Sequence, residues 1–385
     1  MMVQYKPNVP DEAIIGEITN KIRASLPEWY GHGSRLVSAK PEIRSYQYCF
    51  MLRYPISISA TQQKAILVKI RRNPKMDSLY QAIQSDIHQV MPVEYQTLEF
   101  LYENLAHASP DFSAIRPLLF LEKYFAILME EFPSRTMTQL MIDQRSSPTV
   151  WDSSELRDAA RKTGRWLFFF HHRLHRSDDK PYTSADILEE ARGFAERIES
   201  VSQGRVRASQ ILDRFAERLE NIQIERMKFS QSHLDMTTNN VLYSEEKKVC
   251  IIDMKNRPAP VYVDLGLILT YPETSKRQIF SAGRYYPEAL LHKYREEIIA
   301  GYFEQEPGSE ALVRIYAALK VLDKWRMYEE LMAKYKGRKH FLSVFAAPLV
   351  SAYFQNLLKK YLQRIGDSES GQLFLNKEAA IDDSL

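Results

Sequence analysis

Residues 231–254 read QSHLDMTTNNVLYSEEKKVCIIDM, and the polar residues in this stretch decide the fold. Strand-like residues on both sides of a polar segment predict a β-hairpin whose turn is centred on residues 246–247. This register places Asn240 opposite Asp253 at the open end of the hairpin, and Asp235 precedes Asn240 on the connecting loop. Amide and carboxylate oxygens are ligands that Mg²⁺ shares with phosphate groups. The stretch therefore predicts a magnesium and phosphate site.

Other interpretations of these residues exist. An isolated Asp235 would fit a turn or helix cap, but its spacing from Asn240 and Asp253 favours a metal and phosphate site. A metal-dependent hydrolase would need further His or carboxylate ligands.

The pattern His233-Leu-Asp235-x-x-x-x-Asn240, followed by Ile-Ile-Asp253, resembles the catalytic loop and metal-binding Asp of the protein-kinase-like superfamily. Within it the aminoglycoside phosphotransferase family is the most similar, and Asp264 follows at that family's spacing. The resemblance implies an α+β, two-lobed protein-kinase-like fold, with a small antiparallel-sheet N-lobe and a large, mainly helical C-lobe. It implies ATP and Mg²⁺ as cofactors, Asp235 as the catalytic group, and Asn240 and Asp253 as metal ligands. Asp264 is expected to accept hydrogen bonds from catalytic-loop amides.

Four more residues match the same family in the same order. Lys69, in AILVKI, resembles the Lys that binds the α- and β-phosphates, and Glu94 resembles its ion-pair partner. Glu130 and Phe132 resemble the hinge, whose backbone carbonyl and amide would bind adenine. Taken alone, Lys69 also fits an ordinary strand lysine, and Glu99 is an alternative partner to Glu94.

The sequence departs from the family at several positions. Leu234 replaces a Gly, Thr237 a His and Met254 an aromatic residue. The first hairpin, 36–52, contains no Gly, so residues 40–46 would have to cover the phosphates. These departures keep open the alternative of a catalytically weak pseudokinase or binding module with the same fold.

Hydrophobic periodicity predicts the domain organisation. A helix is expected at 11–30, three antiparallel strands from about residue 35, a helix after residue 91, and two strands around a Glu-Lys turn before residue 132. The remainder is expected to be helical, apart from a strand-rich segment at 227–270. The expected domains are an N-lobe at 1–131, a C-lobe at 132–365 with the catalytic loop at 233–240 and the metal-binding hairpin at 241–264, and a mobile tail at 366–385.

Composition excludes several classes of protein. Among 385 residues, 45% are hydrophobic and 26% charged, which is typical of a globular protein. A net charge of +3 is too small for a general nucleic-acid or membrane-surface binder, and two cysteines form no disulfide framework. The sequence therefore predicts a cytoplasmic protein without nucleic-acid or membrane partners; it does not predict an oligomeric state.

The length of one segment and the charge of another narrow the class of molecule that would accept the phosphate. Ten residues separate Asp253 from Asp264, which is too short for the activation segment of a protein kinase, the alternative that the sequence favours less. Residues 271–365 contain 16 Lys and Arg against 10 Asp and Glu, and the run at 334–340 is the densest. Such a region disfavours polycationic acceptors. We therefore expect phosphate transfer to a hydroxyl of a sugar or related neutral or anionic metabolite, unless these charges are only solvated helix faces.

Overall fold

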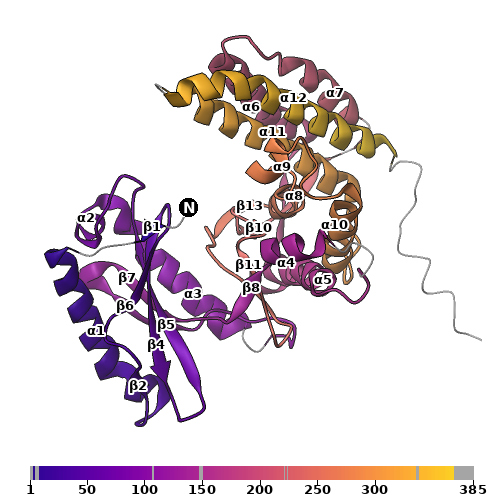
Figure 1. Cartoon of the computed structure of the whole chain (residues 1–385). Coiled ribbons are helices and arrows are strands. Elements are labelled where there is room, and N and C mark those ends of the chain that lie inside the picture. Colours follow the sequence, from indigo (N-terminus) through magenta and orange to yellow (C-terminus); the bar gives the residue numbers. More distant parts are fainter. Residues whose placement is uncertain are drawn as a thin grey trace, which may run out of the picture. The chain divides into compact units, whose positions relative to one another are not determined.

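The structure, a computed structural model, describes residues 3–4, 8–105, 108–146, 151–220, 222, 224–334 and 338–367. The chain forms two compact units (Figure 1). One contains Met1–Ser134 and Ser244–Ile252, and the other contains Arg135–Tyr243 and Asp253–Leu385. The first is built on an antiparallel sheet and the second is mainly helical, which confirms the predicted α+β class.

The sheet of the first unit has seven strands, with the order β1-β3-β4-β5-β7-β6 and β2 paired to β4. Of the two long central strands, β4 alternates partly buried and buried residues, whereas β5 is buried at five of its nine residues without strict alternation. Between residues 35 and 71 the structure has four strands, one more than the three predicted there, because β2 and β3 are short. The strands are β1 (Val3–Gln4), β2 (Arg35–Leu36), β3 (Glu42–Ser45), β4 (Cys49–Ser57), β5 (Gln63–Arg71), β6 (Pro117–Leu121) and β7 (Ala126–Glu130).

Three helices accompany this sheet: α1 (Val9–Tyr30), α2 (Leu79–Ile83) and α3 (Met91–Leu105). Helix α1 buries Ile14, Ile18 and Ile22 in one cluster with the inward side chains of β4 and β5. Asn8 caps α1 by accepting a hydrogen bond from the Asp11 backbone N–H, at 3.1 Å. In Figure 1, α1 and α3 lie on opposite sides of the sheet, so both faces are covered.

The segment Ser244–Ile252, which the sequence analysis assigns to the C-lobe, belongs to the sheet unit. It contains the short strand β12 (Val249–Ile251). The Val249 backbone N–H donates to Asp111 O at 2.9 Å, and the Ser113 N–H donates to Val249 O at 2.8 Å. These bonds join β12 to the chain before β6, a long-range pairing that local sequence patterns do not reveal.

The second unit has two long helices at its core, α11 and α12, and a small antiparallel sheet in the order β13-β10-β9. Its elements are α4 (Met137–Gln144), α5 (Glu155–Phe168), a π-helix (Phe169–Leu174), β9 (Asp178–Pro181), α6 (Ser184–Ser202), α7 (Ser209–Glu220), β10 (Arg226–Ser232), β13 (Arg257–Pro260), α8 (Tyr262–Thr270), α9 (Lys276–Phe280), α10 (Glu288–Tyr302), α11 (Glu310–Ala333) and α12 (Arg338–Asp367). Two short strands, β8 (Ser134–Thr136) and β11 (Val241–Ser244), stand where the chain passes between the units.

Two expectations for this part need comment. The strand-rich segment at 227–270 ends in helix α8, whose residues YVDLGLILT are buried almost all round, and periodicity cannot distinguish such a helix from a buried strand. The tail expected at 366–385 lies, from residue 368 onwards, outside the described residues.

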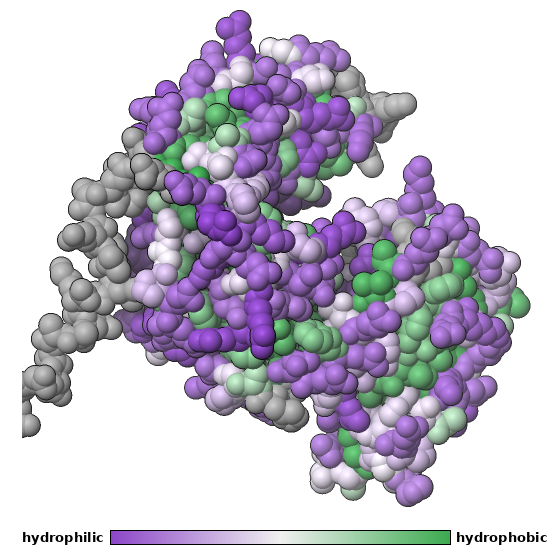
Figure 2. All heavy atoms as spheres, turned by 180° about the vertical axis from the view of Figure 1, so that it is seen from behind, coloured by the Kyte–Doolittle hydropathy of each residue, from purple (hydrophilic) through white to green (hydrophobic). Residues whose placement is uncertain are grey.

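Most of the surface drawn in Figure 2 is hydrophilic, with hydrophobic residues scattered over it. Among the described residues, no helix is long and apolar enough to cross a membrane.

Two glycines let helices α5 and α10 approach closely. A Cβ at Gly164 would lie 2.7 Å from Tyr302 N and closer still to Ile298 O, and a Cβ at Gly301 would meet the backbone of Arg161. Both neighbours are backbone atoms, which cannot rotate away. The helix contact therefore requires glycine at both positions.

We predict that Gly164→Ala lowers the free energy of unfolding by about 1–3 kcal/mol, because the added methyl overpacks this contact. Gly193→Ala is the matched control: it lies in α6 with nothing within 4 Å, and should stabilise by about 0.5–1 kcal/mol. Thermal melting checks both. Equal melting temperatures for the two variants would contradict the close approach.

Candidate active site

Lys69 and Glu94 form an ion pair inside the sheet unit. Lys69 lies on β5, flanked by Met51 on β4 and Ile127 on β7, and its Nζ is 2.7 Å from Glu94 Oε1. Both side chains are about nine-tenths buried. Glu94 lies in the first turn of α3, where the helix dipole favours a carboxylate. The structure thus pairs Lys69 with Glu94, as expected from the sequence; that the pair binds ATP stays a prediction.

Arg71 is a further residue of this group that the sequence analysis missed. Its guanidinium donates to Glu94 Oε2 at 3.0 Å. Lys69 and Arg71 are two residues apart on one strand, so their side chains point to the same face of the sheet. This spacing could have indicated from the sequence that Arg71 lies beside Lys69. Glu99, the alternative partner of Lys69, instead interacts with Tyr95 and helps burial raise the pKa of that phenol to about 12.

The expected hinge follows β7. Glu130 ends this strand, and its backbone N–H donates to Arg116 O at 2.9 Å. Its carboxylate accepts from Tyr30 Oη at 3.0 Å and pairs with Lys64. Burial and this carboxylate raise the pKa of Tyr30. The adenine-binding role of the Glu130 carbonyl and the Phe132 amide stays a prediction.

In the helical unit, Asp264 holds the loop that contains Asp235. Asp264 is fully buried in the first turn of α8 and accepts the backbone N–H groups of His233, at 2.6 Å, and Leu234, at 2.8 Å. His171 Nε2 lies 3.1 Å from the same carboxylate. Burial raises the pKa of Asp264, but the hydrogen bond from His171 and the loop amides outweigh this and hold it below its usual range. Asp264 is the structural anchor that the sequence predicts.

The carboxylate of Asp235 remains accessible while its backbone is fixed. Asn240 Nδ2 donates to Asp235 O at 2.9 Å, and the Asp235 N–H donates to His233 Nδ1 at 3.2 Å. His233 therefore orders the loop, as expected. The Asp235 side chain is 46% exposed, and Lys255 Nζ lies 4.0 Å from its Oδ2. The Asp235 carboxylate is therefore accessible to solvent and is not held in a buried ion pair.

The expected hairpin register is wrong by one residue. It would pair Ser244 with Val249, but the Ser244 N–H donates to Lys248 O at 3.0 Å and the Lys247 N–H donates to Ser244 O at 2.9 Å. Lys247 adopts a left-handed conformation with φ of 60°, which adds a third residue to the turn. The register therefore no longer supports placing Asn240 directly opposite Asp253.

The residues still fit a magnesium ion chemically. Asn240 uses its Nδ2 on the loop, which leaves its oxygen as a possible ligand, and Asp253 adopts the strained φ of 61° that is common at functional sites. The described residues contain no cluster of three or more His, Cys, Asp or Glu able to hold a metal. Mg²⁺ does not require one, since it usually keeps waters and takes phosphate oxygens as ligands. The metal role of both residues stays a prediction.

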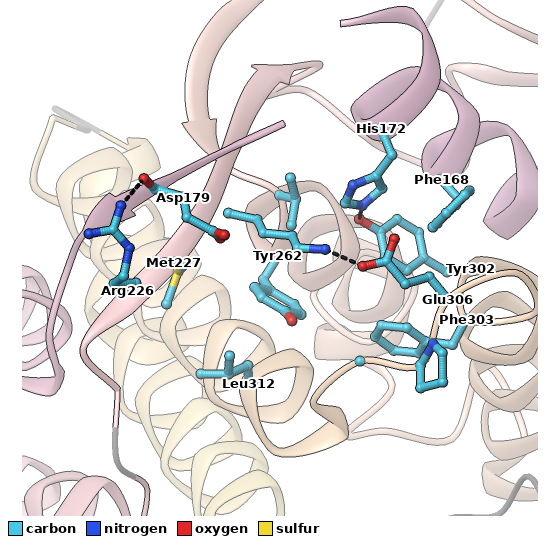
Figure 3. A pocket seen from close by; sticks show the side chains of 14 residues that line it. Phe168, His172, Asp179, Arg226, Met227, Tyr262, Tyr302, Phe303, Glu306 and Leu312 are labelled. Carbon is cyan, nitrogen blue, oxygen red and sulfur yellow. Dashed lines mark hydrogen bonds and ion pairs between the residues drawn. The ribbon is translucent and has the colours of Figure 1, made fainter. Parts of the chain in front are cut away.

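A chain of hydrogen bonds connects Asp264 to the wall of a cavity of about 210 Å³ (Figure 3). His171 Nδ1 and His172 Nε2 both lie 3.1 Å from Tyr302 Oη, and His172 Nδ1 lies 2.8 Å from Ser177 Oγ. Figure 3 shows His172 directed at Tyr302 on one wall of the cavity. The cavity lining contains none of the predicted site residues, so this cavity is not the predicted site.

The lowered pKa of His172 makes the free energy of unfolding depend on pH. Burial, then His171, Lys228 and Arg173 lower its pKa to about 4, while Glu306 raises it. An unfolded His has a pKa near 6.5, so between about pH 6.5 and pH 4 the unfolded chain binds a proton that the folded chain does not. The contribution of His172 to stability is complete above about pH 6.5 and is lost as the pH falls toward 4.

We predict that His172→Gln reduces the loss of stability between pH 7 and pH 4 by about 1–2 kcal/mol, after discounting for the partial exposure of the ring. Chemical denaturation at several pH values measures this. His292→Gln, at an exposed position of α10, is the control and should follow the wild-type curve. An unchanged pH profile in His172→Gln would contradict the neutral, buried state.

No protein-family model matches this sequence, and no curated protein is significantly similar to it. Among solved structures, a glucosamine kinase in complex with glucosamine, ADP and inorganic phosphate aligns over 93% of this chain and 87% of its own, with 11% identity and a TM-score of 0.50. A choline kinase from Cryptosporidium parvum Iowa II aligns over 92% and 96%, with 12% identity and a TM-score of 0.49. A macrolide 2'-phosphotransferase from Brachybacterium faecium, an apoenzyme, aligns over 85% and 98%, with 12% identity and a TM-score of 0.48.

The chain has the fold of the aminoglycoside phosphotransferase-like kinases. The resemblance stated from the sequence is thereby confirmed at the level of the fold. Of the predicted residues, Lys69 and Glu94 lie on the sheet unit, and Asp235, Asn240 and Asp253 lie on the helical unit. At these identities the likeness extends to the fold alone, and the roles of the residues rest on their chemistry.

Proposed function

We propose that the protein is an ATP-dependent kinase that transfers the γ-phosphate to a hydroxyl of a sugar or related neutral or anionic metabolite. The observation that carries this proposal is the loop of Asp235. Two backbone N–H groups of this loop, from His233 and Leu234, donate to Asp264 and fix the loop, while the Asp235 carboxylate stays 46% exposed. A carboxylate held in this way can orient an acceptor hydroxyl and accept its proton.

The chemistry of phosphoryl transfer suits such a group. Transfer proceeds through a loose transition state, so positioning and charge stabilisation contribute more than strong basicity. Asp235 would orient the hydroxyl and take its proton late. Lys69, held by Glu94, would bind the α- and β-phosphates. Asn240 and Asp253 would hold Mg²⁺, which when bound neutralises the charge that develops on the phosphate oxygens.

The segment between Asp253 and Asp264 supports a small acceptor. It includes strand β13, which pairs with β10 from Phe229 opposite Pro260 to Ser232 opposite Arg257. Four of the ten residues between Asp253 and Asp264 are thus held in a sheet, which leaves little chain for an activation segment. This favours a small-molecule kinase over a protein kinase.

A catalytically weak pseudokinase or binding module is the second candidate. Leu234, at the position of the family's Gly, has a φ of 59°, which strains a bulky residue. The turn of the β3–β4 hairpin also contains no Gly. Measuring ATP consumption over a panel of sugars and metabolites separates the two candidates.

We predict that Asp235→Asn lowers turnover by roughly a hundred-fold or more, while affinity for ATP changes by no more than a few-fold. The amide keeps the shape of the side chain but cannot accept the proton. Initial rates and ATP titration measure the two effects separately. Asp213→Asn, on an exposed part of α7, is the control. Weaker ATP binding with unchanged turnover of the bound complex would assign Asp235 to nucleotide binding instead.

We predict that nucleotide binding requires Mg²⁺ or Mn²⁺, and that Asp253→Ala abolishes both this dependence and activity, because it removes a charged ligand of the ion. Calorimetric titration of ATP with and without magnesium tests this, with Asp213→Ala as the control. The assignment is wrong if ATP binds wild type and Asp253→Ala equally well in both conditions.

A further inference from the structure

Lys324 differs from the other lysines and arginines of its region. Within 271–334 and 346–363, where the structure describes the side chains, every other half-buried or buried Lys or Arg has a carboxylate within 4.0 Å. Those residues are Arg295, Arg314, Lys320, Arg326 and Lys360. Lys324 is half-buried on α11, and no carboxylate among the described residues lies that close to its ammonium group. A desolvated ammonium group without a carboxylate partner is unfavourable, so this position favours an added anion.

The ammonium group of Lys324 lies beside the catalytic loop. Its Nζ is 6.0 Å from the centre of the Tyr271 ring, and Asn239 Nδ2 donates to Tyr271 Oη at 2.6 Å. Asn239 belongs to the loop 233–240 that also contains Asp235. Lys324, Tyr271 and the loop are all parts of the helical unit. The contact therefore does not depend on where the two units lie.

Electrostatics indicates the same neighbours. Burial lowers the pKa of Lys324, the Asp235 and Asp323 carboxylates raise it, and Lys255 lowers it. Asp235 likewise contributes, after burial, to a raised pKa of Tyr271. Lys324 is thus close enough to both Asp235 and Lys255 to interact with their charges.

Two ammonium groups therefore accompany the Asp235 carboxylate at the place where an acceptor hydroxyl would bind, while the Asp323 carboxylate is paired with Arg326 at 2.7 Å. Lys255 lies 4.0 Å from Asp235 and is exposed, whereas Lys324 approaches from α11. Once the hydroxyl of an acceptor is on Asp235, its other groups meet a net positive field. That field repels ammonium substituents and attracts carboxylate or phosphate substituents.

Resting on the kinase function proposed above, we infer that Lys324 is a specificity-determining residue that binds an oxyanion, a carboxylate or a phosphate, on the hydroxyl-bearing acceptor. The anion supplies the charge partner that Lys324 lacks, with a charge-assisted hydrogen bond. The Tyr271 hydroxyl, held by Asn239, fixes the loop against this subsite. This gives the site a selectivity that the overall net charge of the chain does not.

The experiment uses four hexose acceptors of similar size that differ in charge: glucose, glucosamine, glucuronate and glucose 1-phosphate. Initial rates at saturating ATP and magnesium give KM for each acceptor, and KM for ATP is measured separately. Calorimetric titration of the ADP-bound protein with the same compounds gives their affinity without turnover. Glucuronate and glucose 1-phosphate distinguish a carboxylate from a phosphate as the favoured oxyanion.

The variants are Lys324→Gln, Lys324→Arg and the control Lys293→Gln. Lys293 is exposed on α10, so its replacement removes the same charge at a position outside the site. We expect wild type to bind at least one anionic acceptor roughly tenfold or more tightly than glucose, and glucosamine most weakly. Lys324→Gln should lose this preference with KM for ATP unchanged, whereas Lys324→Arg and Lys293→Gln should keep it.

Three results would overturn the inference: no preference for an anionic acceptor in wild type, a preference that survives Lys324→Gln, or a raised KM for ATP as the main effect of that variant. The last would place Lys324 on the γ-phosphate. Failure of the kinase function itself is a different observation, namely no transfer of γ-phosphate to any acceptor. The calorimetric titration then still decides, since Lys324-dependent binding of glucuronate or glucose 1-phosphate supports the subsite and its absence contradicts it.

Discussion

The buried carboxylate of Asp264 is the group on which the conformation of the loop 233–240 depends. Burying an ionised carboxylate in a protein interior costs roughly several kcal/mol unless it is paired and hydrogen-bonded. Here the loop supplies two backbone donors, from His233 and Leu234, and His171 supplies a third. His171 is in turn bonded to Tyr302, so the loop, the π-helix after α5 and the end of α10 are held through one charge. The position of Asp235 follows from these contacts.

The backbone conformation of Leu234 is strained and opposes this arrangement of the loop. The left-handed conformation costs an L-residue about 1–2 kcal/mol, and the related family uses Gly at this position. Two features offset the strain: the Leu234 N–H donates to Asp264, and the partly buried side chain packs against the hydrophobic core of the helical unit. A Gly would relieve the strain but would lose this packing. The departure from the family pattern is therefore compatible with an ordered loop.

The sequence allowed prediction of the α+β class and the pairing of Lys69 with Glu94, because both depend on strong local patterns placed in a known order. It did not allow prediction of the hairpin register, since nothing in EEKK distinguishes a two-residue turn from the three-residue turn that Lys247 makes. Helix α8 was missed because a fully buried helix has no polar face. Arg71 and Lys324 were missed for another reason: their roles appear only when side chains from separate elements meet.

The number of charged residues in a region does not by itself predict its electrostatic field, because many of these charges are paired. The excess of basic residues at 271–365 suggested a site for neutral or anionic acceptors, but the run at 334–340 lies, after Lys334, outside the residues whose side chains the structure describes. Elsewhere the buried and half-buried cations mostly neutralise carboxylates, as Arg295 does for Glu273 and Glu288. Such pairs produce little field at a distance. The proposed preference for an anionic acceptor therefore rests on Lys324, which has no close carboxylate among the described residues, and net charge alone could not have identified it.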